Sequence, residues 1–404
     1  MPVITGLDTD MSKMTTRELP AAMLGLMAAG AALGSASIQA NQPLLPAMAS
    51  SLSVDPRDVA FVPSFTQWGY AIGLALVVPL FDVVDRRKLV IVMQLLAAGG
   101  LVAFALSPSA TWLAVLAPIL GVVACASQIL TPYAGAISPP ESRARAVATV
   151  LGGVLAGVLI GRVLGGFLGS IISWRAVYLV LAVATVVSAF VLSKILPESR
   201  NPVSERYLMV LRSMARDLVD LPPLRRHGII GMLLFGSFMS FWSSYAFLLK
   251  DTFDIGPSGA GAVALVGLGG AVAAPRAGRL VDRGGFVLAS AVGSAAALFG
   301  WAIASFGNRS VVILAIGALV LDLGIGLAHG ANMSALQRRY PTMGGRINAV
   351  YMVMYFVGGA LGSAIAPALQ LDYGWNSVAM FGAAVSLLSL VLLAIWRRSF
   401  SAAG

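Results

Sequence analysis

Residues 86–106 read RRKLVIVMQLLAAGGLVAFAL, three basic residues followed by a long run without any charge. A helix of about 20 apolar residues crosses the roughly 30 Å hydrocarbon core of a bilayer. The same alternation of short charged clusters and long apolar runs continues along all 404 residues, of which 58% are apolar and 11% are charged. Soluble domains carry about 25% charged residues. This composition therefore excludes a soluble enzyme, a nucleic-acid-binding module and a disordered chain.

We predict an all-α membrane protein with twelve transmembrane helices. Strands of a membrane β-barrel are shorter than these runs, and apolar and polar residues alternate along them. The runs in this sequence show no such alternation. The predicted helices cover residues 20–40, 60–81, 89–106, 112–134, 146–172, 177–196, 228–250, 260–281, 286–306, 311–335, 347–369 and 375–396. Residues 1–18 lack the apolar centre of a cleavable signal peptide, so none is expected.

The basic residues are unevenly divided between the two sides of this arrangement. Of the 27 Lys and Arg residues, 22 lie in the termini and in the loops that share their side, and four lie in the opposite loops. Because cytoplasmic loops carry the excess of Lys and Arg, both termini are predicted to be cytoplasmic. Topology and contact with anionic lipid headgroups then account for the net charge of +10, without a nucleic-acid partner.

The two halves of the chain match at a nearly constant offset, which indicates an internal duplication. The matching pairs, 200 or 201 residues apart, are Asp82 and Asp282, Pro140 and Pro341, Arg145 and Arg346, Gly157 and Gly358, Gly161 and Gly362, and Trp174 and Trp375. We predict a cytoplasmic segment 1–19, a six-helix half 20–196, a cytoplasmic linker 197–227 and a second half 228–404. Transporters built from such repeats bind their substrate between the halves, near the bilayer midplane.

Two loop motifs resemble a cytoplasmic signature of the major facilitator superfamily, G-x-L-A-D-R-x-G-R-R-K. They are VPLFDVVDRRK at 78–88 and GRLVDRGG at 278–285; the first lacks both glycines. The helix predicted at 146–172 resembles the antiporter signature G-x(3)-G-P-x-x-G-G, with Arg162 in the place of the proline. The arginine that many proton-coupled drug exporters carry in the fourth helix is replaced by Ala117. The chain thus resembles the twelve-helix drug or metabolite:proton antiporter group, which implies alternating access; the Ala- and Gly-rich composition suits a bacterial inner membrane.

Two further sets of residues bear on conformational change. Exposed charge pairs in the loop motifs contribute about 0–1 kcal/mol each, enough to bias two states of similar energy; alternatively, these residues only set topology. The gating candidates are Asp82, Arg86, Arg87, Gly278, Asp282 and Arg283. A glycine at every fourth position lets a second helix approach closely. The predicted packing glycines are Gly153, Gly157, Gly161, Gly165 and Gly169.

Two charged residues, Arg162 and Asp322, lie deep inside predicted spans. Each is about ten residues, or roughly 15 Å, from the outer end of its helix, so they share one depth. Charge inside a membrane is costly and points to function. We predict that Asp322 carries the coupling proton, because burial favours the protonated carboxyl whereas a nearby guanidinium favours the ionised one. Arg162 either pairs with Asp322 or holds an anionic group of the substrate.

Several polar residues within the spans predict a central cavity. His329 follows Asp322 on the same helical face and is either a proton relay or simply a hydrogen-bonded cavity residue. The other cavity candidates are Gln39, Gln42, Gln67, Gln128, Ser240, Tyr245, Asn332, Asn348, Tyr351 and Tyr355. Aromatic neighbours, Trp68, Phe241, Trp242 and Phe356, would make the site suitable for amphipathic molecules.

The sequence contains no nucleophile–base pair, phosphate-binding loop or metal-ligand spacing, so we expect no enzyme, no cofactor and no metal site. We predict a secondary active transporter, a monomer among membrane lipids, that exports small organic molecules by using the proton gradient. One alternative is a proton-coupled importer of an organic anion or metabolite. An alternative of another class is a membrane receptor that binds its ligand without transporting it.

Overall fold

The structure is a computed structural model that describes residues 19–198, 207–341 and 343–401, without the side chains of 268–284, 398, 399 and 401. Eleven helices within these residues are long and apolar enough to cross a membrane. The prediction of an all-α membrane protein is confirmed. The predicted span 260–281 corresponds to the short helix α12, the 3-10 turn η4 and the beginning of α13. The number twelve and the cytoplasmic location of the termini stay predictions.

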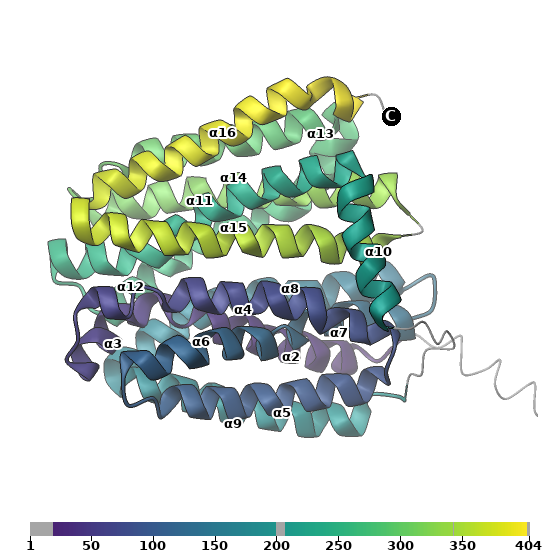
Figure 1. Ribbon diagram of the computed structural model, residues 1–404, viewed down its shortest axis with the longest axis horizontal. Helices are drawn as coiled ribbons and strands as arrows, with labels where there is room; N and C mark the ends of the chain where they lie inside the picture. Colours follow the sequence, from purple (N-terminus) through teal and green to yellow (C-terminus); the bar gives the residue numbers. More distant parts are fainter. Residues whose placement is uncertain (1–18, 199–206, 342, 402–404) are drawn as a thin grey trace, which may run out of the picture.

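The helices form two groups that lie one above the other with their axes roughly aligned (Figure 1). The first group consists of α2 (Ala21–Gln39), η1 (Gln42–Leu44), α3 (Leu45–Leu52), η2 (Pro56–Asp58), α4 (Val62–Leu76), η3 (Val78–Asp82), α5 (Arg86–Ala105), α6 (Ala110–Ala124), α7 (Ala126–Ile137), α8 (Arg143–Ile171) and α9 (Trp174–Ile195). Pro43 and Pro46 each stand in the first two positions of their elements. Because proline has no N–H to donate, the first span breaks after α2 and continues as η1 and α3.

The second group follows a helix that lies outside both groups. That helix is α10 (Tyr207–Asp220). The second group consists of α11 (Pro222–Phe253), α12 (Pro257–Ala264), η4 (Leu265–Gly267), α13 (Leu268–Ala304), α14 (Val311–Arg339), α15 (Gly344–Tyr373) and α16 (Trp375–Ser401). Within α13 the backbone bends at Gly285, whose φ of 78° suits glycine. This bend separates the stretches predicted as the eighth and ninth spans.

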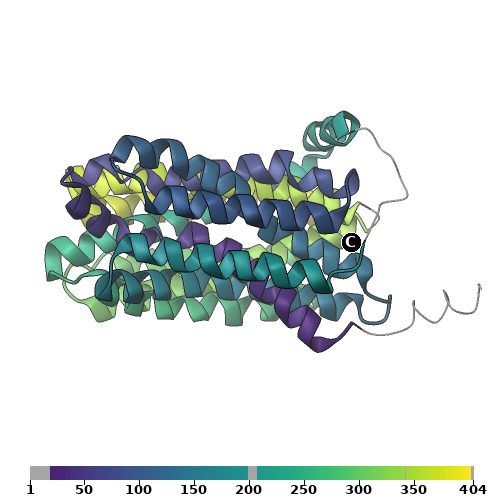
Figure 2. The ribbon, with the colours of Figure 1, turned by 90° about the horizontal axis from the view of Figure 1, so that it is seen from below.

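Helix α10 crosses one end of the molecule and contacts both groups (Figure 1, Figure 2). The Tyr207 hydroxyl donates to the carbonyl of Leu76 in α4, at 2.6 Å. Near the other end of α10, Asp217 forms an ion pair with Arg346 of α15, at 2.5 Å. The segment predicted as the linker 197–227 therefore contains a helix, and α11 begins inside it.

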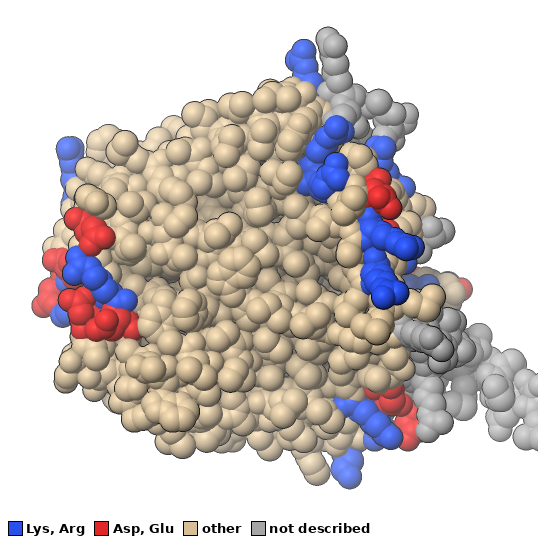
Figure 3. Space-filling model, in the orientation of Figure 1, with Lys and Arg blue, Asp and Glu red and all other residues tan. Residues whose placement is uncertain are grey.

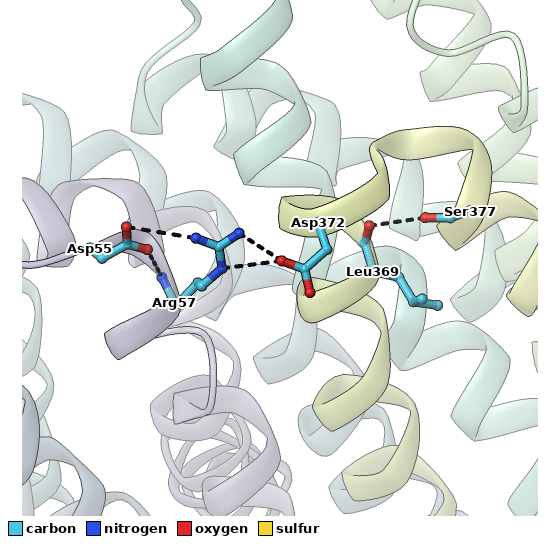
Figure 4. Close-up of polar contacts among 5 residues, drawn as sticks. All are labelled: Asp55, Arg57, Leu369, Asp372 and Ser377. Carbon is cyan, nitrogen blue, oxygen red and sulfur yellow. Dashed lines mark hydrogen bonds and ion pairs between the residues drawn. The ribbon is translucent and has the colours of Figure 1, made fainter.

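At the opposite end of the molecule, polar contacts join the two groups; those of Arg57 are shown in Figure 4. Arg57 of η2 lies 2.6 Å from Asp372 of α15 and 3.9 Å from Asp55. The Ser64 hydroxyl of α4 donates to the Ala360 carbonyl of α15, at 2.9 Å. Charged side chains gather at these two ends, and a broad uncharged belt separates them (Figure 3). This distribution fits a bundle that crosses a bilayer.

The glycines of α8 lie against α2. A Cβ atom added at Gly153, Gly157 or Gly161 would lie only 2.2, 2.2 and 2.5 Å from the carbonyl oxygens of Ala28, Ala32 and Ala36. Gly165 and Gly169 continue this contact towards Ala40 and Leu44. At the equivalent place in the second group, Gly358 and Gly362 of α15 approach the backbone of α11 in the same way. Close backbone packing thus fixes α8, and with it Arg162, against the first span.

Candidate substrate and proton site

Arg162 lies in the middle of α8 and is 1% exposed. Its Nε donates a hydrogen bond of 2.6 Å to Oε1 of Gln42, which stands at the start of η1, where the first span is broken. The Gln42 amide nitrogen donates in turn to Oε1 of Gln39, at 2.7 Å, and to the sulfur of Met239 in α11, at 3.6 Å. The broken helix therefore places an amide oxygen on one side of the buried guanidinium.

Trp242 of α11 connects the two charged residues. The guanidinium carbon of Arg162 lies 4.1 Å from the centre of the Trp242 ring, and 5.2 Å from that of Phe238. Such stacking over an aromatic face is attractive, most of all where water is excluded. The indole Nε1 of Trp242 donates to Oδ1 of Asp322, at 3.0 Å. Within the described part of the chain, no direct ion pair joins Arg162 to Asp322.

Asp322 lies in α14 and is 3% exposed. Its second oxygen, Oδ2, faces Gly267 in η4: a Cβ atom added there would lie 3.1 Å from this oxygen and 3.8 Å from Nη1 of Arg162. The two charges predicted at one depth therefore flank the same glycine. Arg162 comes from the first group of helices, whereas Asp322 and Trp242 come from the second.

Three polar atoms around this centre are buried and have no hydrogen-bond partner among the described residues. They are Nη2 of Arg162, Oε1 of Gln67 and Oδ1 of Asn41. The Gln67 amide nitrogen donates to the Met239 sulfur at 3.6 Å, so this weak acceptor lies between two glutamines. An unpaired buried polar group costs about 1–3 kcal/mol, and such groups are uncommon. Two of these atoms, on Arg162 and Gln67, belong to side chains that are linked through Gln42 and Met239, which suits a site whose ligand supplies the missing partners.

The two predicted polar residues that follow Asp322 have different surroundings. His329 shares a hydrogen bond of 3.1 Å with the Tyr351 hydroxyl, and its ring lies 4.6 Å from that of Tyr355. Asn332 instead contacts His227 of α11, at 2.9 Å. His227, which was given no role, lies buried in α11, inside the segment predicted as the linker. The Pro222-Pro223 pair was the available sign that this helix begins earlier.

The remaining cavity candidates are more dispersed. The Ser240 hydroxyl donates to the Gly236 carbonyl within α11, and the Tyr245 hydroxyl to the Ala260 carbonyl of α12. Gln128 and Asn348 are half-buried. Met239, Phe238 and Gly267 were not predicted, because an apolar residue or a glycine carries no polar signal in the sequence.

The gating candidates are described only in part. Arg86 donates to the carbonyl of Phe81 and lies over its ring, whereas Arg87 donates to the Ser193 carbonyl of α9. Asp82 is exposed. The side chains of Gly278, Asp282 and Arg283 lie outside the described residues. These contacts of Arg86 and Arg87 are with η3 and α9, which belong to the same group of helices.

Comparison with known proteins agrees with this architecture. The family model of the Major Facilitator Superfamily matches residues 24–363. The putative uncharacterized transporter YgaY of Escherichia coli (strain K12) is 34% identical over 384 residues, which cover 95% of this chain and 97% of that protein. A probable transporter of Streptomyces coelicolor is 33% identical over 88% of this chain and 83% of its own. The crystal structure of the human organic anion transporter MFSD10 superposes with a TM-score of 0.69 at 18% identity, covering 93% of this chain and all of the other. The last of these shows similarity of fold alone.

Proposed function

The chain belongs to the Major Facilitator Superfamily of transporters, and from this premise we propose that it couples the movement of a small organic molecule to protons through Asp322. It is a multi-pass membrane transporter and not an enzyme. The observation that carries the proposal is a buried guanidinium and a buried carboxyl group, one from each group of helices, that contact the ring face and the N–H of Trp242. We propose that it works as a monomer and draws its energy from the proton gradient, without a cofactor.

Alternating access gives this arrangement a way to change proton affinity. Arg162 and Gln42 belong to the first group, whereas Trp242 and Met239 belong to the second. If one group tips against the other, the contacts of Arg162 with Trp242 and of Gln42 with Met239 must break. Asp322 is then surrounded by water or cargo in place of the nearby guanidinium. Proximity of the cation and exposure to water are the terms that set the protonation of a buried carboxyl.

The direction of transport depends on which charge holds the cargo. Our first proposal is efflux by exchange, in keeping with the resemblance to the antiporter group. In that case cargo and proton must not bind at the same time. A cationic molecule and a proton would meet this condition, because both would compete for the carboxylate of Asp322. By linkage, binding of such a cargo releases a proton.

A second candidate is uptake of an organic anion together with a proton. It is favoured by Nη2 of Arg162, which has no partner among the described residues. An anion bound there competes with ionised Asp322 for the same guanidinium. Protonation of Asp322 would therefore strengthen anion binding, and by linkage anion binding would take up a proton. An inward proton gradient would then drive uptake.

The sign of proton exchange distinguishes the two candidates. Purified protein in weakly buffered detergent solution, with a pH indicator, would be titrated with tetraphenylphosphonium and with benzoate. Release of protons on addition of the cation supports efflux, whereas uptake of protons on addition of the anion supports the second candidate.

Transport itself is measured in liposomes with an imposed pH gradient, after subtraction of the flux into protein-free vesicles. Asp322→Asn should abolish the gradient-driven part, and Asp58→Asn, at an exposed position of η2, should retain it. Full gradient dependence in Asp322→Asn would refute the assignment of the proton to this carboxyl. Binding without any accumulation would indicate the receptor.

A further inference from the structure

The guanidinium of Arg162 has an edge that is only half used. In a guanidinium, the Nε hydrogen and one Nη2 hydrogen point in the same direction, so one carboxylate can accept from both. Here Nε donates to Gln42 at 2.6 Å, whereas Nη2 is buried and has no partner among the described residues. The single amide oxygen of Gln42 therefore occupies half of a site that fits two oxygens.

The guanidinium is held in a fixed orientation. Trp242 lies against its face, with Phe238 next to it, and α8 is fixed by its glycine contacts with α2. A donor that is already oriented loses little conformational freedom when a ligand binds. The two parallel donors of this edge are thus prepared for a planar acceptor with two oxygens.

Gln42, in contrast, is held weakly. It lies in a 3-10 turn of three residues, and its other contacts are a neutral amide of Gln39 and the sulfur of Met239. Thioether sulfur is a weak acceptor. Hydrogen bonds between two charged partners are stronger than those to a neutral amide. A carboxylate should therefore displace Gln42 from Arg162.

We propose that the cargo is a small organic monocarboxylate whose two oxygens bind the Nε–Nη2 edge of Arg162 in place of the Gln42 amide. The inference rests on the second candidate of the proposed function, the organic anion, because it assumes that an anionic cargo moves through this site. One guanidinium edge serves one monoanionic group. Phe238 and Trp242 lie over the guanidinium and Met239 lies against Gln42, so the part of the molecule next to the carboxylate should be apolar.

The test is binding to the purified full chain by isothermal titration calorimetry. The probes are benzoate, 3-phenylpropionate and hexanoate, each compared with its primary amide and with the amine of the same skeleton. We expect at least one carboxylate to bind about tenfold or more tighter than both of its analogues. Arg162→Lys should lose about tenfold or more for that carboxylate, because an ammonium cannot offer two parallel donors.

Substitutions of Gln42 separate ligand binding from a structural role. Gln42→Glu places a carboxylate of the protein on the same edge and should weaken binding by about tenfold or more. Gln42→Ala removes the competing amide and should strengthen binding. The matched control is Gln94→Glu: Gln94 is a buried glutamine of α5 that donates to Ser188 at 3.3 Å, and this variant should bind as the wild type does. If Arg162→Lys elutes as an aggregate in size-exclusion chromatography, the two Gln42 variants decide.

The inference is overturned if no carboxylate binds better than its amide, or if Gln42→Glu binds as tightly as the wild type. Proton-driven transport of an amine that requires Asp322 would then leave the proposed function standing without the carboxylate. Conversely, carboxylates that bind with the expected pattern but do not accumulate in liposomes would contradict transport and support the site.

Discussion

Substituting one glycine of α8 tests whether close backbone packing positions the buried arginine. In Gly157→Ala the new methyl carbon would lie 2.2 Å from the Ala32 carbonyl oxygen, so α8 and α2 must separate by about 1 Å to restore a normal contact. Forcing extra atoms into a packed region costs about 1–3 kcal/mol. Because Arg162 is one and a half turns further along α8, the same displacement should disturb its contacts with Gln42 and Trp242.

The matched control lies in the same helix. A Cβ atom at Gly152 meets nothing within 4 Å, so Gly152→Ala adds the same atoms without a clash. Replacing glycine by alanine inside a helix gains up to about 1 kcal/mol in propensity. We therefore expect Gly152→Ala to unfold at the wild-type temperature or above it, and Gly157→Ala well below it, when purified protein is heated in detergent and followed by tryptophan fluorescence. Equal unfolding temperatures for the two variants would refute the packing argument.

Two further predictions concern charges at the end of the molecule opposite α10. Arg57→Ala removes an exposed pair worth about 0–1 kcal/mol, which corresponds to up to about fivefold in the population of a state opened at this end. A cysteine placed at the buried Ser64 should then react faster with a membrane-impermeant maleimide. As the control, Arg175→Ala removes a contact to Ser107 within the first group and should leave the rate unchanged. Equal rates for the two variants would show that the pair of Arg57 and Asp372 does not hold this end together. A hydrogen bond from Lys250, together with its charge, lowers the pKa of Asp254, which lies just beyond α11. The stabilising effect is therefore complete above the usual aspartate pKa of 3.8 and fades as the pH falls through the lowered value; Lys250→Met should flatten the acid limb of the unfolding-temperature curve, and an unchanged limb would contradict the assignment.

The membrane spans could be predicted because hydropathy and length follow directly from the sequence. The breaks within a span depend instead on single residues such as proline. Pro43 and Pro46 end α2 early and create η1, and without that break Gln42 would not reach Arg162. Helix α10 was not predicted because it is amphipathic and only 14 residues long, whereas a membrane span is an apolar run of about 20 residues. His227 falls inside the predicted linker because basic residues directly precede it, although α11 extends back to Pro222.

The depth of the two charges could also be predicted, because an α-helix rises by a constant 1.5 Å per residue. Their partners could not. Which residue lies between Arg162 and Asp322 depends on how α8, α11 and α14 are rotated about their axes and how they cross. Trp242 was recognised only as one aromatic among several, and its role depends on presenting its face to one charge and its N–H to the other.

Because the Trp242 indole lies between the two charged groups, each of them keeps contacts when the other is neutralised, unlike the partners of a direct ion pair. A buried pair in contact is strongly destabilised when one partner is lost, since the other charge is left uncompensated. Here Asp322 keeps a hydrogen bond from Trp242, and Arg162 keeps the aromatic face together with Gln42, so neither group depends on the other for all its contacts. Protonation of Asp322 therefore need not collapse the site, and Nη2 of Arg162 stays available to a ligand. A transporter requires this combination, because its two states must remain close enough in energy for cargo and proton to shift the balance between them.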